Sequence, residues 1–172
     1  MMKTKLGISS CLLGVNVRYD GGHKLNLFLN DALGAFIEYV TVCPEVECGL
    51  GVPREAMRLE GDPANPRLIA IRSKRESTSL LVDWANKRVA ELESENLSGF
   101  VFKSDSPSCG MEHIKVYNEE GIAFKTGVGI FSRIFMGHFP ELPVEDEVRL
   151  QDPMLRESFI KKIFALQRSQ GV

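Results

Sequence analysis

The sequence has no long apolar run and little excess charge of either sign. No apolar stretch in the 172-residue sequence comes close to the roughly 20 residues that a membrane-spanning helix needs. The first residues form only a short apolar run, broken by Ser9 and Ser10, and no small-residue cleavage site follows, so a signal peptide is not expected. The net charge of −2 gives no global reason to expect binding to nucleic acid or to a membrane. We therefore expect a cytoplasmic protein without membrane contact.

Cysteine is also scarce. The chain has four cysteines, Cys11, Cys43, Cys48 and Cys109. Proteins of reducing compartments rarely carry disulfide frameworks, so a metal-binding or catalytic role has to be weighed instead. Free cysteine is among the most buried residue types, which makes a core position the simplest interpretation of any one of them. Their positions relative to the predicted strands decide between these interpretations.

The hydrophobic pattern predicts a single α/β domain. Hydrophobic residues make up 44% and charged residues 26% of the sequence, which is ordinary for a soluble globular protein. The predicted strands cover residues 5–10, 39–42, 67–71 and 99–103. The predicted helices cover residues 25–37, 80–92 and 130–139. Such alternation is typical of a mostly parallel sheet with flanking crossover helices, and residues 116–124 are expected to form an extended or hairpin excursion from it.

The last part of the chain differs in character from the rest. Residues 141–147 are acidic and contain proline, which is typical of a linker. A final helix is expected to begin at Asp152-Pro153, a capping residue followed by proline at the first helical position. Its apolar face docks on this domain, pairs in a dimer or begins a second domain, and the sequence leaves these three alternatives open. We therefore divide the chain into a domain of residues 1–139 and a linker with a helical C-terminal tail, 140–172.

Three of the cysteines follow predicted strands directly. Cys11, Cys43 and Cys109 each lie in a loop rich in Gly, Pro or Ser just beyond a strand. Because the carboxyl ends of parallel strands meet at one edge of a sheet, and ligands bind there in open α/β folds, we expect these three side chains to share a site. Core cysteines would more naturally lie within strands or on apolar helix faces.

A site with three cysteines favours an iron–sulfur cluster used in catalysis. Structural zinc sites usually show paired cysteine knuckles and four ligands, whereas Cys11 and Cys109 are isolated and only Cys43 and Cys48 lie close in sequence. Soft thiolates select zinc, copper(I) or iron–sulfur clusters, and a [4Fe–4S] cluster on three thiolates keeps one iron open to a substrate. Cys48 is either a fourth ligand, which would close the site, or a bystander.

Glu45 and two serines stand beside these cysteines. Glu45 lies two residues after Cys43 and is a candidate general acid/base, the alternative being a surface carboxylate. Ser106 and Ser108 precede Cys109, and their hydroxyls either cap a helix that starts at the next glycine or hydrogen-bond to substrate or cluster sulfur. Arg54, further along, either grips a phosphate or is an ordinary surface arginine.

Taken together, these motifs make the sequence resemble the thiouracil desulfidase family over residues 6–139. The resemblance is carried by Ser10-Cys11-Leu12-Leu13-Gly14, Val17-Arg18-Tyr19-Asp20-Gly21, Cys43-Pro44-Glu45, Gly49-Leu50, Pro53-Arg54 and Ser106-Pro107-Ser108-Cys109-Gly110. Residues 142–159 are similar to the junction into a second domain in longer desulfidases. Several motifs match in the same order, so the resemblance is specific.

The resemblance implies a fold, a cofactor and a reaction. It implies a Rossmann-like fold with a [4Fe–4S] cluster on three cysteines, matched here by Cys11, Cys43 and Cys109. It also implies that Glu45 and a serine, Ser106 in preference to Ser108, act in catalysis, and it leaves Cys48 outside the ligand set. The implied substrates are thiolated uracils: 4-thiouracil, a 4-thiouridine nucleotide, or 4-thiouridine in tRNA. Sulfur would be removed without net redox chemistry, by a monomer or weak dimer.

Two other functions stay open at this stage. The chain could be a non-enzymatic zinc or iron–sulfur module that organises a partner domain, with all four cysteines as ligands. It could also be an RNA-binding accessory domain, for which the support is a set of basic residues: Arg54, Arg58, Arg67, Arg72, Lys74 and Arg75. Acidic residues interleave with this set, which weakens the second alternative.

Overall fold

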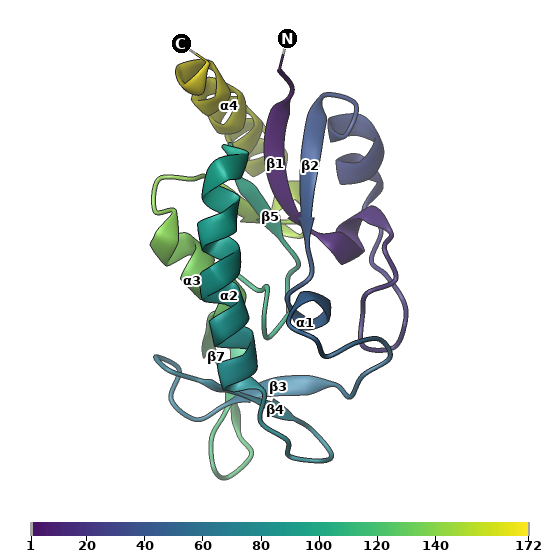
Figure 1. Ribbon diagram of the computed structural model, residues 1–172, viewed down its shortest axis with the longest axis vertical. Coiled ribbons are helices and arrows are strands. Elements are labelled where there is room, and N and C mark those ends of the chain that lie inside the picture. The colour runs from purple at the N-terminus through teal and green to yellow at the C-terminus, as the bar shows by residue number, and fades with distance from the viewer. Residues whose placement is uncertain (1, 172) are drawn as a thin grey trace.

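The computed structural model describes residues 2–171 and contains two four-stranded sheets. Sheet A has the order β2-β1-β5-β8, and its neighbouring strands are all parallel. These strands are β1 (Thr4–Ser9), β2 (Ile37–Val42), β5 (Phe100–Phe102) and β8 (Val144–Asp146). In Figure 1, sheet A occupies the upper part of the molecule and sheet B lies beneath it. The predicted α/β class with a mostly parallel sheet and flanking helices is confirmed.

Alternating side chains divide the core of sheet A into two layers. Phe100 and Phe102 point to one face of β5, where they pack with Phe131 and Phe135. That face is covered by α2 (Thr78–Leu92) and α3 (Ile130–His138). A β-carbon at Gly7 of β1 would overlap the Phe100 ring, so this strand pair needs glycine at that position.

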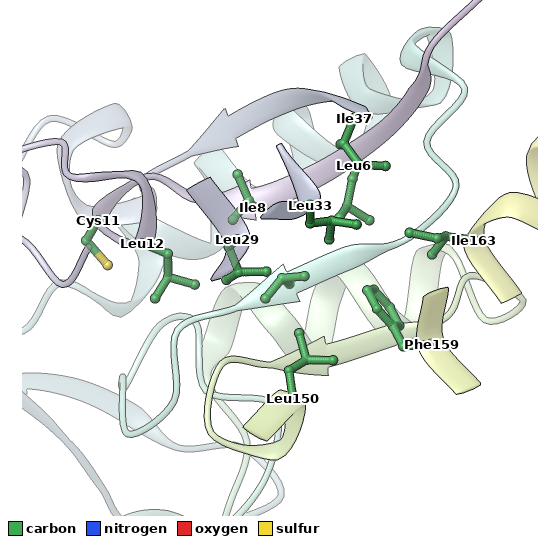
Figure 2. Close-up of a cluster of buried hydrophobic side chains, with 11 residues drawn as sticks. Leu6, Ile8, Cys11, Leu12, Leu29, Leu33, Ile37, Leu150, Phe159 and Ile163 are labelled. Carbon is green, nitrogen blue, oxygen red and sulfur yellow. The ribbon is translucent and has the colours of Figure 1, made fainter. Parts of the chain in front are cut away.

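The opposite face of sheet A is covered by a helical turn and by the last helix. Phe159 and Ile163 of α4 (Pro153–Gln170) belong to one buried cluster with Leu6 and Ile8 of β1, and Figure 2 shows the members of this cluster. The cap at Asp152 forms as the sequence predicts, because its carboxylate accepts hydrogen bonds from the first backbone amides of the helix. Of the three alternatives considered for the apolar face of this helix, the structure shows the first: the helix docks on this domain.

Residues of the acidic segment join the sheet. Val144–Asp146, which the sequence analysis placed in a linker, form β8 beside β5, and a short turn, η4 (Arg149–Gln151), follows. Their charges have local partners: the Glu145 carboxylate lies 2.7 Å from Arg149 Nε, and Asp146 accepts hydrogen bonds from two backbone amides. An acidic composition therefore did not prevent an ordered edge strand here.

The predicted helix over residues 25–37 is wrong in extent. Only η2 (Phe28–Leu33) is helical, and Ile37 already begins β2. The Asn26 side chain accepts a hydrogen bond from the Leu29 backbone amide, which starts the turn, and Tyr39 donates its hydroxyl to the Leu29 carbonyl at 2.6 Å. The apolar periodicity is therefore shared between one buried helical turn and the next strand.

Sheet B contains the excursion and a hairpin that the sequence did not reveal. Its order is β4-β3-β6-β7, with β3 antiparallel to β4 and β6 antiparallel to β7. The strands are β3 (Met57–Glu60), β4 (Arg67–Ala70), β6 (Ile114–Tyr117) and β7 (Ala123–Gly127). The hairpin predicted around residues 116–124 is confirmed, but the strand predicted at 67–71 belongs to this second sheet and not to the parallel one.

The inner face of sheet B is apolar and rests on the ends of two helices. Leu59, Leu68 and Val116 pack there with Leu81 of α2 and Ile130 of α3. Three short helical segments complete the element order: η1 (Ser10–Leu13), α1 (Pro44–Glu47) and η3 (Glu93–Glu95). Within residues 2–171, none of the helices combines the length and the apolar character that a bilayer crossing requires.

Candidate functional site

Cysteines gather at the carboxyl edge of sheet A. Cys11 lies in η1 directly after β1, Cys43 lies between β2 and α1, and Cys109 follows β5 in a loop. Because β2, β1 and β5 are adjacent parallel strands, these positions meet at one edge, and Figure 2 shows Cys11 just beyond the end of β1. All three are buried free thiols, and all three line a cavity of about 410 Å³.

The loop that carries Cys109 is held by its own serine and by the amino end of α3. The Ser106 hydroxyl accepts hydrogen bonds from the backbone amides of Cys109 at 3.0 Å and of Ser108 at 3.3 Å. A β-carbon at Gly129 would come within 2.6 Å of the Ser108 carbonyl oxygen, so glycine is needed where α3 approaches the loop. No helix begins at Gly110, and the capping alternative for the serines is therefore wrong: Ser106 closes a turn.

Glu45 is a buried carboxylate within this constellation. It projects from α1, is 9% exposed, and accepts a hydrogen bond from the Ser108 hydroxyl on Oε1. Its other oxygen lies 3.8 Å from Cys43 Sγ and 3.9 Å from a guanidinium nitrogen of Arg54. The surface-carboxylate alternative for Glu45 is wrong, since three partners surround it inside the cavity wall.

The two serines differ in what they contact. Ser108 is fully buried, bonds to Glu45, and lies 3.8 Å from Cys109 Sγ. Ser106 is partly exposed, lines the cavity, and has its hydroxyl 3.1 Å from that of Ser108. A chain of hydroxyls therefore connects the cavity to the Glu45 carboxylate. Which serine acts in catalysis stays a prediction.

Burial raises the pKa of all three thiols above the ordinary value for cysteine. It raises the pKa of Cys43 to about 12, with the nearby Glu45 carboxylate adding to the effect. Burial also raises the pKa of Cys109, and it raises the pKa of Cys11 against partial opposition from Lys103 and Arg18. Each thiol thus keeps its proton at neutral pH until a cationic group replaces it, as happens when thiolates bind a metal centre.

The donor set fits a cluster better than a single ion. Over the described residues, 2–171, no group of three or more His, Cys, Asp and Glu side chains is arranged to hold one metal ion. One zinc ion needs thiolate sulfurs about 4 Å apart, since each Zn–S bond is about 2.3 Å. Three thiols around a cavity of about 410 Å³ suit a cofactor that is several atoms wide. This geometry does not support a four-cysteine zinc module.

Cys48 lies apart from the three other cysteines. It is half-buried, directs its thiol to the Glu45 carbonyl oxygen at 3.3 Å, and is not among the residues that line the cavity. Its position matches the bystander alternative better than that of a fourth ligand.

Cationic side chains complete the cavity wall. Arg18, Lys24, Arg54 and Lys103 all contribute to it. Sequence reasoning missed Lys103 and its partner Glu147, whose charged groups are 2.6 Å apart. The signal for Lys103 was its place at the end of a predicted strand, but nothing in the acidic segment marked Glu147 as its partner.

The basic residues considered for RNA binding are partly neutralised. Arg58 lies 3.3 Å from Glu60 and stacks over the Tyr117 ring, and Arg72 lies 3.6 Å from Glu55. These contacts give an RNA-binding accessory function no specific support.

Two comparisons with known proteins indicate thiouracil desulfuration, and a third finds an uncharacterized relative. A family model described as 2-thiouracil desulfurase matches residues 6–147. The chain is 32% identical over 108 residues to the uncharacterized protein YbbK of Bacillus subtilis strain 168, a match that covers 60% of this chain and 71% of that protein. It is also similar to the solved structure of TudS, a [4Fe-4S]-dependent thiouracil desulfidase, with a TM-score of 0.70 and 30% identity over 91% of this chain and 99% of that one.

Proposed function

We propose that this chain, which belongs to the 2-thiouracil desulfurase family, removes sulfur from a thiolated uracil with a [4Fe–4S] cluster held by Cys11, Cys43 and Cys109. The observation that carries the proposal is the convergence of three buried thiols on one cavity beside the Glu45 carboxylate. The similar TudS structure, described as [4Fe-4S]-dependent, supports the choice of cluster. When bound, such a cluster supplies a soft Lewis-acid iron that polarises the carbon–sulfur bond of the substrate.

In the proposed reaction, water replaces sulfur. A thiocarbonyl and water become a carbonyl and hydrogen sulfide, so no electron donor or acceptor is needed. Glu45 is the general base that takes a proton from water, because its carboxylate lines the cavity and lies 3.8 Å from the Cys43 thiol. Arg54, 3.9 Å away, balances the charge of this carboxylate.

The serines hold the base and pass protons. Ser108 donates a hydrogen bond to Glu45 and so orients the carboxylate, while Ser106 lies on the cavity wall 3.1 Å from Ser108. Because Ser106 is the serine that borders the cavity, we assign the contact with water or substrate to Ser106 and the orienting role to Ser108.

The cavity suits a substrate that carries a phosphate. Arg18 and Lys24 on its wall provide charges for a phosphate. We therefore propose a 4-thiouridine nucleotide ahead of free 4-thiouracil or 4-thiouridine in tRNA. A higher kcat/KM for the nucleotide than for the base supports this order, and the reverse ranking contradicts it.

The function is tested on protein purified and reconstituted without oxygen. Loss of the thione absorbance of 4-thiouracil or its nucleotide should accompany about four iron and four acid-labile sulfide per chain, the composition of a [4Fe–4S] cluster. Cys11→Ala, Cys43→Ala and Cys109→Ala should each abolish turnover, with Cys48→Ala as the matched control that largely keeps it. One zinc per chain without sulfide, or an equal loss for Cys48→Ala, would contradict the proposal.

A further inference from the structure

A largely shielded ion pair that the proposed reaction does not use lies at the edge of the cavity. Lys103 follows β5 and Glu147 follows β8, and these strands pair in parallel with Phe102 opposite Asp146. The residues that leave the two strands therefore meet: Lys103 Nζ lies 2.6 Å from a Glu147 oxygen, and the two side chains are only 13% and 12% exposed. Ion pairs this well shielded are uncommon without a structural or functional reason.

Every hydrogen of the Lys103 ammonium has a partner within the protein. Besides Glu147, it donates to the Ser104 carbonyl at 2.8 Å and to the Ser104 hydroxyl at 3.1 Å. Glu147 in turn accepts from the Ser104 backbone amide at 2.9 Å and from its hydroxyl at 2.7 Å. Lys103 can therefore act on a ligand through its charge, since it has no hydrogen free for a new bond.

The positive end of this pair faces the cavity. Lys103 and Ser104 belong to the cavity wall together with Cys11, and Glu147 does not line it. The Lys103 backbone amide donates to the Ser9 hydroxyl at 2.9 Å, which ties the end of β5 to the end of β1, two residues before Cys11. The Glu45 carboxylate also lines the cavity, and Arg54 already balances its charge.

A [4Fe–4S] cluster on three thiolates carries a net negative charge, because the thiolates outweigh the positive iron–sulfur core, and sulfide that leaves a substrate would add to it. The reduction potential of an iron–sulfur cluster depends on the net charge around it and on its hydrogen bonds. A fixed cation beside one thiolate stabilises added negative charge, both on the cluster and on sulfur that leaves a substrate.

We propose that Lys103, held in place by Glu147, is a positioning residue that sets the positive potential on the Cys11 side of the cavity. The inference rests on the proposed cluster function and extends it to a residue of the acidic segment after β8. Glu147 acts through Lys103 and the Ser104 peptide, since it lies outside the cavity wall.

The test compares charge-removing and charge-keeping variants of the anaerobically purified holoprotein. Lys103→Met should make the midpoint reduction potential of the cluster more negative and lower kcat/KM for 4-thiouracil about ten- to a hundredfold, the usual range for residues behind metal ligands. Lys103→Arg should keep the potential and most of the activity. Lys5→Met is the matched control, because Lys5 also forms a partly buried ion pair, 3.0 Å from Glu95, but does not line the cavity.

A double variant covers the case in which Lys103→Met fails to fold around an unpaired Glu147. Lys103→Met combined with Glu147→Gln leaves no buried unpaired charge, and its potential should still be more negative than that of the unmodified protein. Potentials equal to the unmodified value in both Lys103→Met and the double variant would overturn the inference, as would an equal shift in Lys103→Arg. If the unmodified protein holds no cluster and no activity, the proposed function fails first, and the two failures are therefore distinguishable.

Discussion

The carboxyl edge of sheet A and the inner face of sheet B are both buried, yet they are built from opposite kinds of residue. At the edge of sheet A, Ser9, Glu45 and Ser108 are buried at 2%, 9% and 0% exposure. The inner face of sheet B consists of leucine, isoleucine and valine side chains, with Leu59 and Leu68 at 0% exposure. Buried polar groups destabilise a fold unless each one has a hydrogen-bond partner.

The difference separates function from support. The polar groups at the edge of sheet A each have a hydrogen-bond partner: Ser108 bonds to Glu45 and lies 3.1 Å from Ser106, and Ser9 accepts from the Lys103 backbone amide. Sheet B has no comparable network on its inner face, and its apolar side chains fill the space under α2 and α3. Substitutions at the edge should therefore affect the reaction first, and substitutions in sheet B should affect stability first.

The largest expected effect is on the rate of the Glu45→Gln variant. Loss of a general base usually lowers kcat about 10²- to 10⁴-fold, and glutamine keeps the size and one acceptor of the side chain. The matched control is Glu145→Gln, because Glu145 is also 9% exposed but pairs with Arg149 and does not line the cavity. Single-turnover rates on cluster-loaded protein measure the effect. Equal losses in the two variants would remove the distinction between edge and support.

The second effect is on stability and concerns Leu59→Ala in sheet B. Removal of a fully buried leucine side chain typically costs about 2–5 kcal/mol of unfolding free energy, which denaturant titration measures. The kcat of the folded, cluster-loaded protein should not change. Leu12→Ala sharpens the comparison: Leu12 is equally buried but follows Cys11 in η1, so this variant should lose both stability and cluster content. A Leu59→Ala protein that is stable but inactive would contradict the assignment of sheet B to support.

A smaller effect is expected on the pH dependence of stability. Burial alone would raise the pKa of Glu147, but hydrogen bonds from Lys103 and Ser104 outweigh it and lower the pKa below the ordinary value of 4.5. The carboxylate therefore stabilises the folded state above about pH 4.5, and this contribution is lost as the pH falls through the lowered folded-state pKa. Compared with Glu147→Gln, the unmodified protein should show an advantage in unfolding free energy at pH 7 that shrinks in acid.

Glu157→Gln provides the control for this titration. Glu157 pairs with Lys161 at 2.7 Å on the surface of α4, and hydrogen bonding to that lysine likewise lowers its pKa. Because this pair is exposed to solvent, its contribution to stability should be much smaller. Burial raises the pKa of Asp146 and the nearby Glu147 charge raises it further, so Glu147→Gln also changes the titration of Asp146, whereas Glu157→Gln does not. A flat difference between pH 7 and pH 4 for Glu147→Gln would contradict the lowered pKa.

The sequence predicts the cysteine edge because its strands have clear ends. Residues 39–42 are β-branched or aromatic and stop at Cys43-Pro44, and the strand predicted over residues 99–103 stops as clearly before the polar loop that carries Cys109. Because β2, β1 and β5 are neighbouring parallel strands, their carboxyl ends lie at the same edge of the sheet. The three cysteines could therefore be assigned to one edge without knowledge of any contact.

Sheet B and the ion pair at the cavity could not be predicted in the same way. Strand β3 has four residues, two of them charged, so its pattern gives no strand signal, and β8 has an acidic sequence typical of a loop. Lys103 and Glu147 are 44 positions apart, and their contact depends on the pairing of β5 with β8. Sheet B, β8 and the Lys103–Glu147 contact depend on the pairing of short strands that are far apart in sequence. Local composition gives no signal for such pairing.

The smallest expected effect compares two residues with left-handed backbone conformations, one in each region. Asp105, φ 54°, lies on the cavity wall between Ser104 and Ser106, and Lys74, φ 60°, lies in the exposed turn after β4. This conformation costs a non-glycine residue about 1 kcal/mol, and glycine adopts it freely. Asp105→Gly and Lys74→Gly should therefore each raise the melting temperature by a few degrees at most, which calorimetry detects. Only Asp105→Gly should lower kcat, because a more flexible backbone at this position allows the Ser106 hydroxyl to move away from Ser108. A loss of rate in Lys74→Gly instead would indicate that sheet B takes part in the reaction.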